Sequence, residues 1–208
     1  MTDILKDCPA QPVARLLLAH GAGAAVQSPF MQQLTAALLQ HKIEVWRFNF
    51  PYMQQQLSTG KKRPPDKIAI LQQYFMQILA LCPSDLPLFC GGKSMGGRVA
   101  SMVSVYPQLR AVFAYGYPFC PPGKSNWRTE HFEQLSCPLF IMQGERDPFG
   151  NKAQLAEKSW ADVSLQWLPG ADHDYKPLKK TGLTQQQLIT QAALFTSEKI
   201  NEIILANQ

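Results

Sequence analysis

The sequence predicts an α/β fold in which a mostly parallel sheet is flanked by helices. Strand-length apolar runs recur along the 208 residues, and helix-length amphipathic segments separate them. Parallel neighbours need a long crossover connection, so this alternation favours parallel pairing. A chain of this length supports one well-buried core, and we expect a single domain over residues 1–208.

Six runs rich in β-branched or large apolar residues are the predicted strands. They cover residues 14–19, 43–49, 86–91, 111–115, 138–143 and 163–168. Helices on both faces of a parallel sheet would bury such strands completely. We therefore expect about six mostly parallel strands.

Four helices are predicted between and after these runs, at residues 30–40, 67–81, 95–105 and 184–205. In the first of them, Phe30, Leu34 and Leu38 recur at helical spacing on one face. The last segment is the longest. Such amphipathic helices would cover the two faces of the sheet.

Two longer stretches, residues 50–66 and 116–136, interrupt the alternation. We expect them to be loops or partly helical excursions. Both follow predicted strand ends, where ligands bind in open parallel sheets, and both are therefore expected to flank the functional site.

The net charge of +5 is concentrated in the first half of the chain. Its densest cluster, Lys61-Lys62-Arg63, lies between Gly60 and Pro64 in a loop composition without the aromatic residues that stack on bases. We expect no binding to nucleic acid. A solvated loop and a site for an anionic substrate or partner both stay open.

Several classes of protein and site are excluded by pattern. The N-terminal apolar run lacks the length and flanks of a signal peptide, and no apolar stretch approaches the ~20 residues that span a bilayer. Five cysteines without CxxC pairs are expected to be reduced thiols, with Cys90 and Cys137 acting as small apolar residues. We expect a cytoplasmic protein with no membrane association. The sequence does not determine its oligomeric state.

The most informative segment is GxSxG, present as Gly92-Lys-Ser94-Met-Gly96. It directly follows an apolar strand and directly precedes a helical run, which is the context a nucleophile elbow requires. The flanking glycines remove bulk from a strained turn. Ser94 is therefore the candidate nucleophile.

A serine nucleophile needs a base and an acid that orients the base, in the chain order Ser, acid, His. Asp147 lies just past the strand 138–143, and His173 follows the strand 163–168. The less suitable carboxylates are those of Glu145, Asp172 and Asp174. We expect Ser94, Asp147 and His173 to form a catalytic triad.

The remaining histidines divide into two kinds. His20 opens the turn His20-Gly-Ala-Gly23 at the end of the first predicted strand, where an HGxG turn supplies an oxyanion-hole amide. We expect the backbone amides of Ala22 and Met95 to be the two donors. His41 and His131 are expected to be exposed.

The spacing of the residues argues against a phosphate-binding loop and against a metal site. A phosphate-binding GxxxxGKS loop would need glycine at position 87, which is proline. No HExxH or paired Cys/His spacing occurs, so we expect neither a metal nor a cofactor.

With these motifs the chain resembles the α/β-hydrolase superfamily over nearly its whole length. More narrowly, LLLAHGAG, RFNFPYM, RPPD and GGKSMGGRVAS resemble the dienelactone-hydrolase-related group that includes testis-expressed protein 30 and the subunit 3 hydrolase-like domain of a histone acetyltransferase complex. The lysine before the nucleophile is specific to that group. The resemblance implies a minimal fold without a cap domain, and it implies the same triad and amides.

The expected function is a serine hydrolase of esterase or thioesterase type, acting on a small carboxylic ester through an acyl-enzyme. Aromatic residues after strand ends are the candidates for its substrate pocket, with core packing as the alternative for each: Phe50, Tyr52, Tyr117, Phe119 and Phe149. A non-catalytic interaction protein that keeps the fold is the second hypothesis.

Overall fold

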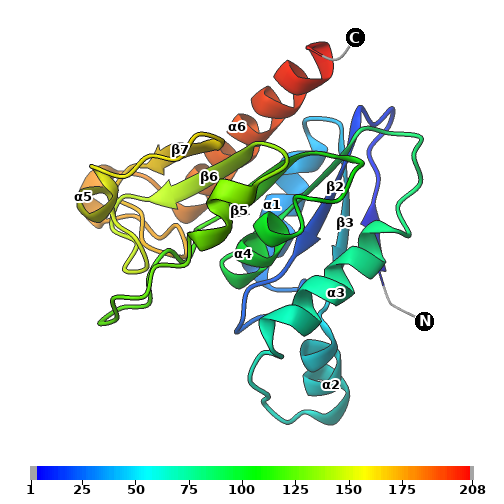
Figure 1. Cartoon of the computed structure of the whole chain (residues 1–208). Coiled ribbons are helices and arrows are strands. Elements are labelled where there is room, and N and C mark those ends of the chain that lie inside the picture. The colour runs from blue at the N-terminus through cyan, green and yellow to red at the C-terminus, as the bar shows by residue number, and fades with distance from the viewer. Residues whose placement is uncertain (1–3, 207–208) are drawn as a thin grey trace.

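The computed structural model of the chain describes residues 4–206, which build one seven-stranded sheet (Figure 1). Its strand order is β1-β3-β2-β4-β5-β6-β7. The six strands that pair in parallel are β2 (Ala14–Ala19), β3 (Ile43–Phe48), β4 (Leu88–Lys93), β5 (Leu109–Tyr115), β6 (Leu139–Gly144) and β7 (Val163–Leu168). These six are the predicted strands, and the α/β class is confirmed.

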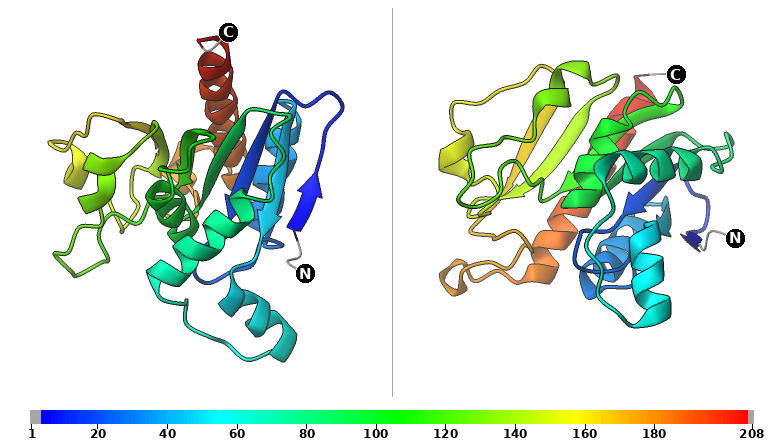
Figure 2. Two further views of the ribbon diagram at one scale, coloured as in Figure 1. Left: turned by 45° about the vertical axis from the view of Figure 1, so that its right-hand side comes forward. Right: turned by 60° about the horizontal axis from the view of Figure 1, so that its bottom comes forward.

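The seventh strand, β1 (Ile4–Asp7), was not predicted. It pairs antiparallel with β3 at one edge of the sheet, beside the N-terminus in Figure 2. Only four residues long and partly exposed, it has too little apolar pattern to be recognised. An ion pair between Asp7 and Arg47 of β3, at 2.7 Å, helps to hold it in place.

Four helices cover the sheet, two on each face (Figures 1 and 2). On one face lie α1 (Pro29–Leu39) and α6 (Gln185–Leu205), and on the other lie α3 (Ile68–Leu79) and α4 (Met95–Met102). They correspond to the predicted helices, although α4 ends three residues earlier than expected, because the amides of Val103 and Ser104 bond three residues back in tighter turns.

The two interrupting stretches contain the short helices α2 (Pro51–Thr59) and η1 (Glu130–Gln134). Pro51 opens α2, where its fixed φ suits the first helical turn. Gly60 ends it in the left-handed conformation, with φ of +68°. Two further short helices were not predicted, α5 (Lys152–Leu155) and η2 (Lys179–Thr181).

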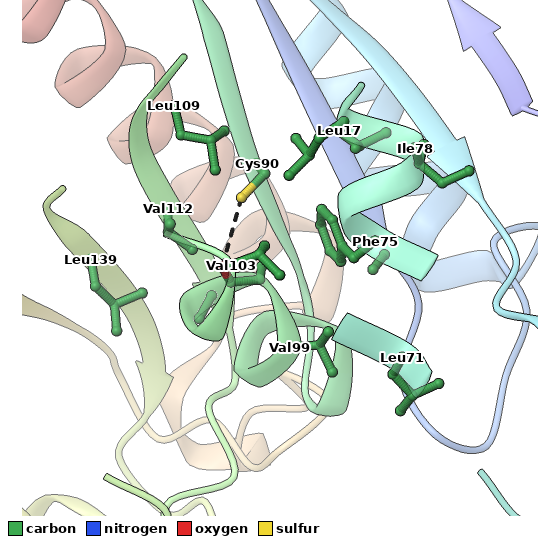
Figure 3. Close-up of a cluster of buried hydrophobic side chains, with 14 of the residues drawn as sticks. Leu17, Leu71, Phe75, Ile78, Cys90, Val99, Val103, Leu109, Val112 and Leu139 are labelled. Carbon is green, nitrogen blue, oxygen red and sulfur yellow. Dashed lines mark hydrogen bonds between the residues drawn. The ribbon is translucent and has the colours of Figure 1, made fainter. Parts of the chain in front are cut away.

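The core consists of two apolar layers, one on each side of the sheet. Figure 3 shows the layer beneath α3 and α4, where Cys90 of β4 packs between Leu17 of β2 and Val112 of β5. Cys90 is fully buried, and burial raises the pKa of its thiol well above the usual range. It therefore acts as a small apolar residue, as its place in an apolar run predicts.

Candidate active site

Ser94 lies on a tight turn between β4 and α4, on the side of the sheet where the carboxyl ends of the parallel strands lie. Its backbone has φ of +52° and ψ of −116°, and this left-handed φ is rare for a residue with a side chain. A Cβ atom on Gly92 would lie 2.6 Å from the oxygen of Ala19, and one on Gly96 would lie 2.6 Å from the oxygens of Ala19 and His20. Both positions therefore require glycine, which lets the turn pack directly against the end of β2.

Three polar side chains form one hydrogen-bonded line at this edge. His173 Nε2 lies 2.8 Å from Ser94 Oγ, and His173 Nδ1 lies 2.7 Å from Asp147 Oδ2. The residues follow β4, β6 and β7, whose carboxyl ends meet here. Since a carboxylate only accepts, Nδ1 carries the imidazole proton and Nε2 is left to accept the proton of the serine hydroxyl.

The carboxylate of Asp147 is fully buried and hydrogen-bonded at both oxygens. Gln143 Nε2 donates to Oδ2 at 2.9 Å, and the amide of Phe149 donates to Oδ1 at 2.8 Å. These bonds compensate its burial and fix its orientation toward His173. Gln143 was missed in the sequence, where a lone polar residue near the end of an apolar strand was the available signal.

The other nearby carboxylates have different partners. Glu145 binds Lys152 Nζ and the amide of Gly170. Asp172 accepts from two backbone amides of its own loop, and Asp174 Oδ1 lies 3.6 Å from Lys93 Nζ. Asp147 is thus the carboxylate that the structure places against His173.

The turn after β2 lies against Ser94 and contains one of the two expected oxyanion donors. A Cβ atom on Gly21 would lie 3.6 Å from Ser94 Cβ. Among residues 4–206, the amides of Ala22 and Met95 donate no hydrogen bond. Met95 is the first residue of α4, where amides lack intrahelical partners. Both amides are therefore free to bind a negatively charged oxygen.

His20 is fully buried behind this turn. Its Nδ1 lies 2.6 Å from the oxygen of Gly21, and its Nε2 accepts from the amide of Phe50 at 3.0 Å. Burial lowers the pKa of His20 to about 4, so its ring is neutral at pH 7. The ring therefore links the turn after β2 to the start of α2.

Lys93, directly before the nucleophile, is a buried cation at the edge of the site. Its Nζ donates to the backbone oxygen of His173 at 2.8 Å and lies 5.4 Å from the centre of the Phe30 ring. Burial lowers the pKa of the ammonium, against the nearby charge of Asp174. No role in a hydrolase site was expected for this lysine, whereas in the structure it ties the loop of His173 to the strand before Ser94.

A cavity of about 580 Å³ opens beside Ser94 and His173. Its walls come from the turn after β2, the start of α1, the elbow, and the loop between β7 and α6. Two aromatic side chains face it, Phe30 and Phe149. The Phe149 ring also lies 4.6 Å from the His173 ring, between ring centres. The cavity has room for a small organic substrate.

Four of the five aromatic residues that were candidates for the substrate pocket take the alternative, core packing. Tyr52, Tyr117 and Phe119 are buried in the core layer of α3 and α4 and do not line the cavity. Phe50 is buried there as well. An aromatic ring that is buried in the core stabilises the fold more than one at the rim of the cavity. The sequence does not distinguish the two positions. Of the five candidates, only Phe149 lies at the cavity.

The expectation that His41 and His131 are exposed was wrong, whereas both alternatives for the basic cluster had been left open. His131 is half-buried, with Nε2 2.7 Å from Ser101 Oγ, and His41 is half-buried as well. The basic cluster Lys61-Lys62-Arg63 is exposed and does not line the cavity, which favours the solvated loop over a substrate site.

Two further observations concern the part of the chain that the structure describes. Within it, no group of three or more His, Cys, Asp or Glu side chains is arranged to hold a metal ion. None of its helices combines the length and apolar character needed to cross a membrane.

Comparisons with known proteins agree with this architecture. A family model described as an alpha/beta hydrolase domain matches residues 12–201. No curated protein sequence matches the chain. Among solved structures, Est1E from Butyrivibrio proteoclasticus is similar with a TM-score of 0.72 at 12% identity, over 97% of this chain and 94% of that one.

Two other solved structures are similar in the same way. A dienelactone hydrolase from Anabaena variabilis has a TM-score of 0.70 at 20% identity, over 94% of this chain and 88% of that one. An α/β serine hydrolase homologue from Coxiella burnetii has a TM-score of 0.70 at 16% identity, over 93% and 90%. At such identities the similarity establishes the fold.

Proposed function

The chain belongs to the α/β-hydrolase domain family, and from that premise we propose that it is a serine hydrolase that cleaves small carboxylic esters or thioesters. The observation that carries the proposal is the hydrogen-bonded line from Ser94 through His173 to Asp147 beside an open cavity. Nucleophile, base and orienting acid are within the 2.6–3.2 Å that proton transfer requires.

In the first half of the reaction, Ser94 Oγ attacks the carbonyl carbon while its proton moves to His173 Nε2. The carbonyl oxygen becomes an oxyanion, which accepts hydrogen bonds from the amides of Ala22 and Met95. Asp147 stays ionised and stabilises the imidazolium. The bond to the leaving alcohol or thiol then breaks, and His173 donates its proton to that group.

In the second half, water takes the place of the alcohol. His173 removes one proton of the water as its oxygen attacks the acyl carbon, and a second oxyanion forms in the same position. Its collapse breaks the bond to Ser94 Oγ, which recovers its proton from His173. The products are a carboxylic acid and the free enzyme, with no cofactor consumed.

The character of the cavity supports a small and largely apolar substrate. Phe30 and Phe149 offer aromatic walls, whereas Lys93 and Lys176 are its cationic residues. The neighbour named as a dienelactone hydrolase supports the same substrate class. A cytoplasmic location and the narrower relation to the dienelactone-hydrolase-related group remain parts of the proposal.

The test is labelling of the wild-type protein by a fluorophosphonate probe, together with hydrolysis of short p-nitrophenyl esters. We expect labelling at Ser94, and we expect Ser94→Ala to lose both labelling and hydrolysis while keeping the melting temperature of the wild type. A wild-type protein that neither labels nor hydrolyses would instead support the non-catalytic interaction protein. Hydrolysis that persists in Ser94→Ala would refute the nucleophile.

A further inference from the structure

Two buried side chains that do not line the cavity hold the turn after β2 by hydrogen bonds. Tyr52 Oη lies 3.0 Å from the oxygen of Ala22 and 3.4 Å from that of Gly21. His20 Nδ1 lies 2.6 Å from the same Gly21 oxygen. Neither ring lines the cavity, and both are at most 1% exposed.

These carbonyls determine where the Ala22 amide points. The oxygen of Gly21 and the N–H of Ala22 belong to one planar trans peptide unit, in which the two groups point in opposite directions. A Gly21 oxygen that is held against His20 and Tyr52 therefore turns the Ala22 N–H away from them. Ala22 lines the cavity beside Ser94, so an N–H turned away from the two buried rings is available to a group bound there.

Steric packing does little to hold the outer part of the turn, residues 22–24, in this orientation. A Cβ atom on Gly23 would meet nothing within 4 Å, and residues 22–24 are exposed. Gly21 and Gly23 flank Ala22 and have wide conformational freedom. The hydrogen bonds from His20 and Tyr52 are thus the contacts that select one orientation.

We propose that Tyr52 and His20 are positioning residues that hold the Gly21–Ala22 peptide with its N–H directed at the oxyanion. This inference rests on the proposed hydrolase function and assigns both residues a part in it. Tyr52 was expected to contact substrate, and it acts instead through the backbone of the turn.

Both donors keep their protons at neutral pH. Burial, with a smaller effect of Asp66, raises the pKa of Tyr52, so its hydroxyl stays protonated. In His20, Nε2 accepts from the amide of Phe50, which leaves the proton on Nδ1 facing Gly21. The Asp66 carboxylate also accepts from the Tyr52 amide at 3.1 Å and so anchors the start of α2.

The kinetic signature follows from when the negative charge exists. The oxyanion forms only after Ser94 attacks, so a poorly directed Ala22 amide weakens the transition state and leaves ground-state binding intact. Outright removal of an oxyanion donor costs roughly 100- to 1000-fold in kcat. A turn that only loses its orientation should cost less, about tenfold.

The experiment compares Tyr52→Phe with Tyr74→Phe. Tyr74 is the matched control, because its ring packs in the same aromatic group and its hydroxyl accepts from Gln54 Nε2, with no bond to the turn. We expect Tyr52→Phe to lower kcat about tenfold with KM within twofold of the wild type. Tyr74→Phe should leave both constants unchanged.

A second readout separates positioning from general loosening of the structure. A trifluoromethyl ketone adds to the serine and forms a stable oxyanion, whereas the product carboxylic acid binds without one. Tyr52→Phe should raise the inhibition constant of the ketone by the same factor by which kcat falls, and should leave that of the acid unchanged. Thermal melting of both variants reports whether they fold.

The outcomes distinguish this inference from the function on which it rests. An active wild type whose Tyr52→Phe variant keeps kcat and ketone affinity would refute the positioning role alone. Equal weakening of ketone and acid, or an equal loss in Tyr74→Phe, would also refute it. A wild type without activity or probe labelling would refute the proposed function and this inference with it.

Discussion

Ser94 combines a reactive hydroxyl with a backbone conformation that residues with side chains rarely adopt. A φ of +52° crowds its Cβ atom, at a cost of about 1–3 kcal/mol that the surrounding structure must offset. The close approach of Gly92 and Gly96 to β2 holds the turn in this shape. The elbow thus exposes the hydroxyl at the expense of stability.

This strain predicts opposite effects of glycine at two serine positions. Ser94→Gly should be more stable than Ser94→Ala by about 1–2 kcal/mol, since glycine has no Cβ atom to crowd. Ser58, in the regular helix α2, is the control, where the glycine variant should be the less stable one. Urea denaturation measures both pairs, and a Ser94→Gly variant less stable than Ser94→Ala would refute the strain.

His20 links the turn after β2 to a dependence of stability on pH. Burial lowers its folded-state pKa to about 4, against 6.5 for the free side chain, so the unfolded chain binds the proton first as pH falls. The stability is fully present above about pH 6.5 and is lost as pH falls toward 4. For this fully buried ring, the shift corresponds to about 3 kcal/mol.

Urea unfolding at several pH values between 7 and 4 measures this loss. His20→Gln should be less stable than the wild type at pH 7 and should show a flatter decline. His131 adds to the wild-type slope, because burial lowers its pKa to about 4 as well, and so some slope should remain in the variant. An equally steep decline in His20→Gln would contradict the assignment to His20.

At the scale of elements, the sheet brings charged side chains together near the amino ends of its strands as well as at the candidate active site. Arg15 of β2 and Glu44 of β3 are register partners and form a 2.6 Å ion pair, with 3% and 8% of each residue exposed. Arg15 also donates to the oxygen of Pro83 at 2.6 Å. It thereby connects two strands to the loop after α3.

Removal of one partner should therefore be far more costly than removal of both. Arg15→Met leaves a buried carboxylate unpaired and should lower the free energy of unfolding by about 3–5 kcal/mol, whereas Arg15→Met with Glu44→Leu should recover most of that loss. Lys199→Met breaks the exposed pair with Glu202 and should cost under about 1 kcal/mol. A double variant no more stable than Arg15→Met would contradict the prediction.

The elements that the sequence predicts are those with a strong local signal. The six parallel strands and the four helices that cover the sheet follow from apolar period and length, whereas β1 has too few residues to show a period. The site was predictable where chemistry demands residue types in order, as for Ser94 and its two expected partners.

Residues that act through three-dimensional contacts were not predictable. Tyr52 and Phe30 are both aromatic, yet one holds a backbone turn and the other faces the cavity at the start of a helix. A helical period placed Phe30 on the same face as Leu34 and Leu38, which are fully buried. Burial and direction depend on the packed sheet, and no short pattern encodes them.

At the scale of the whole molecule, the residues that give the net charge of +5 lie in different positions relative to the cavity. Lys176 is exposed at the cavity itself, and Lys61-Lys62-Arg63 lies in an exposed loop outside it. Charges separated by more than the Debye length, about 10 Å at 0.1 M salt, interact weakly through solvent. Position should therefore matter more than the number of charges removed.

The last prediction compares two variants with an anionic and a neutral ester of equal size. Lys176→Gln should raise KM for the anionic ester about two- to fivefold more than for the neutral one, as expected for an exposed charge worth under about 1 kcal/mol, and salt should reduce the difference. Lys62→Gln with Arg63→Gln removes two charges. It should change the ratio of the KM for the anionic ester to the KM for the neutral ester by no more than about 1.5-fold at 0.1 M salt. A larger selective effect of the double variant would mean that the loop approaches bound substrate, and would return Lys62 and Arg63 to the binding site.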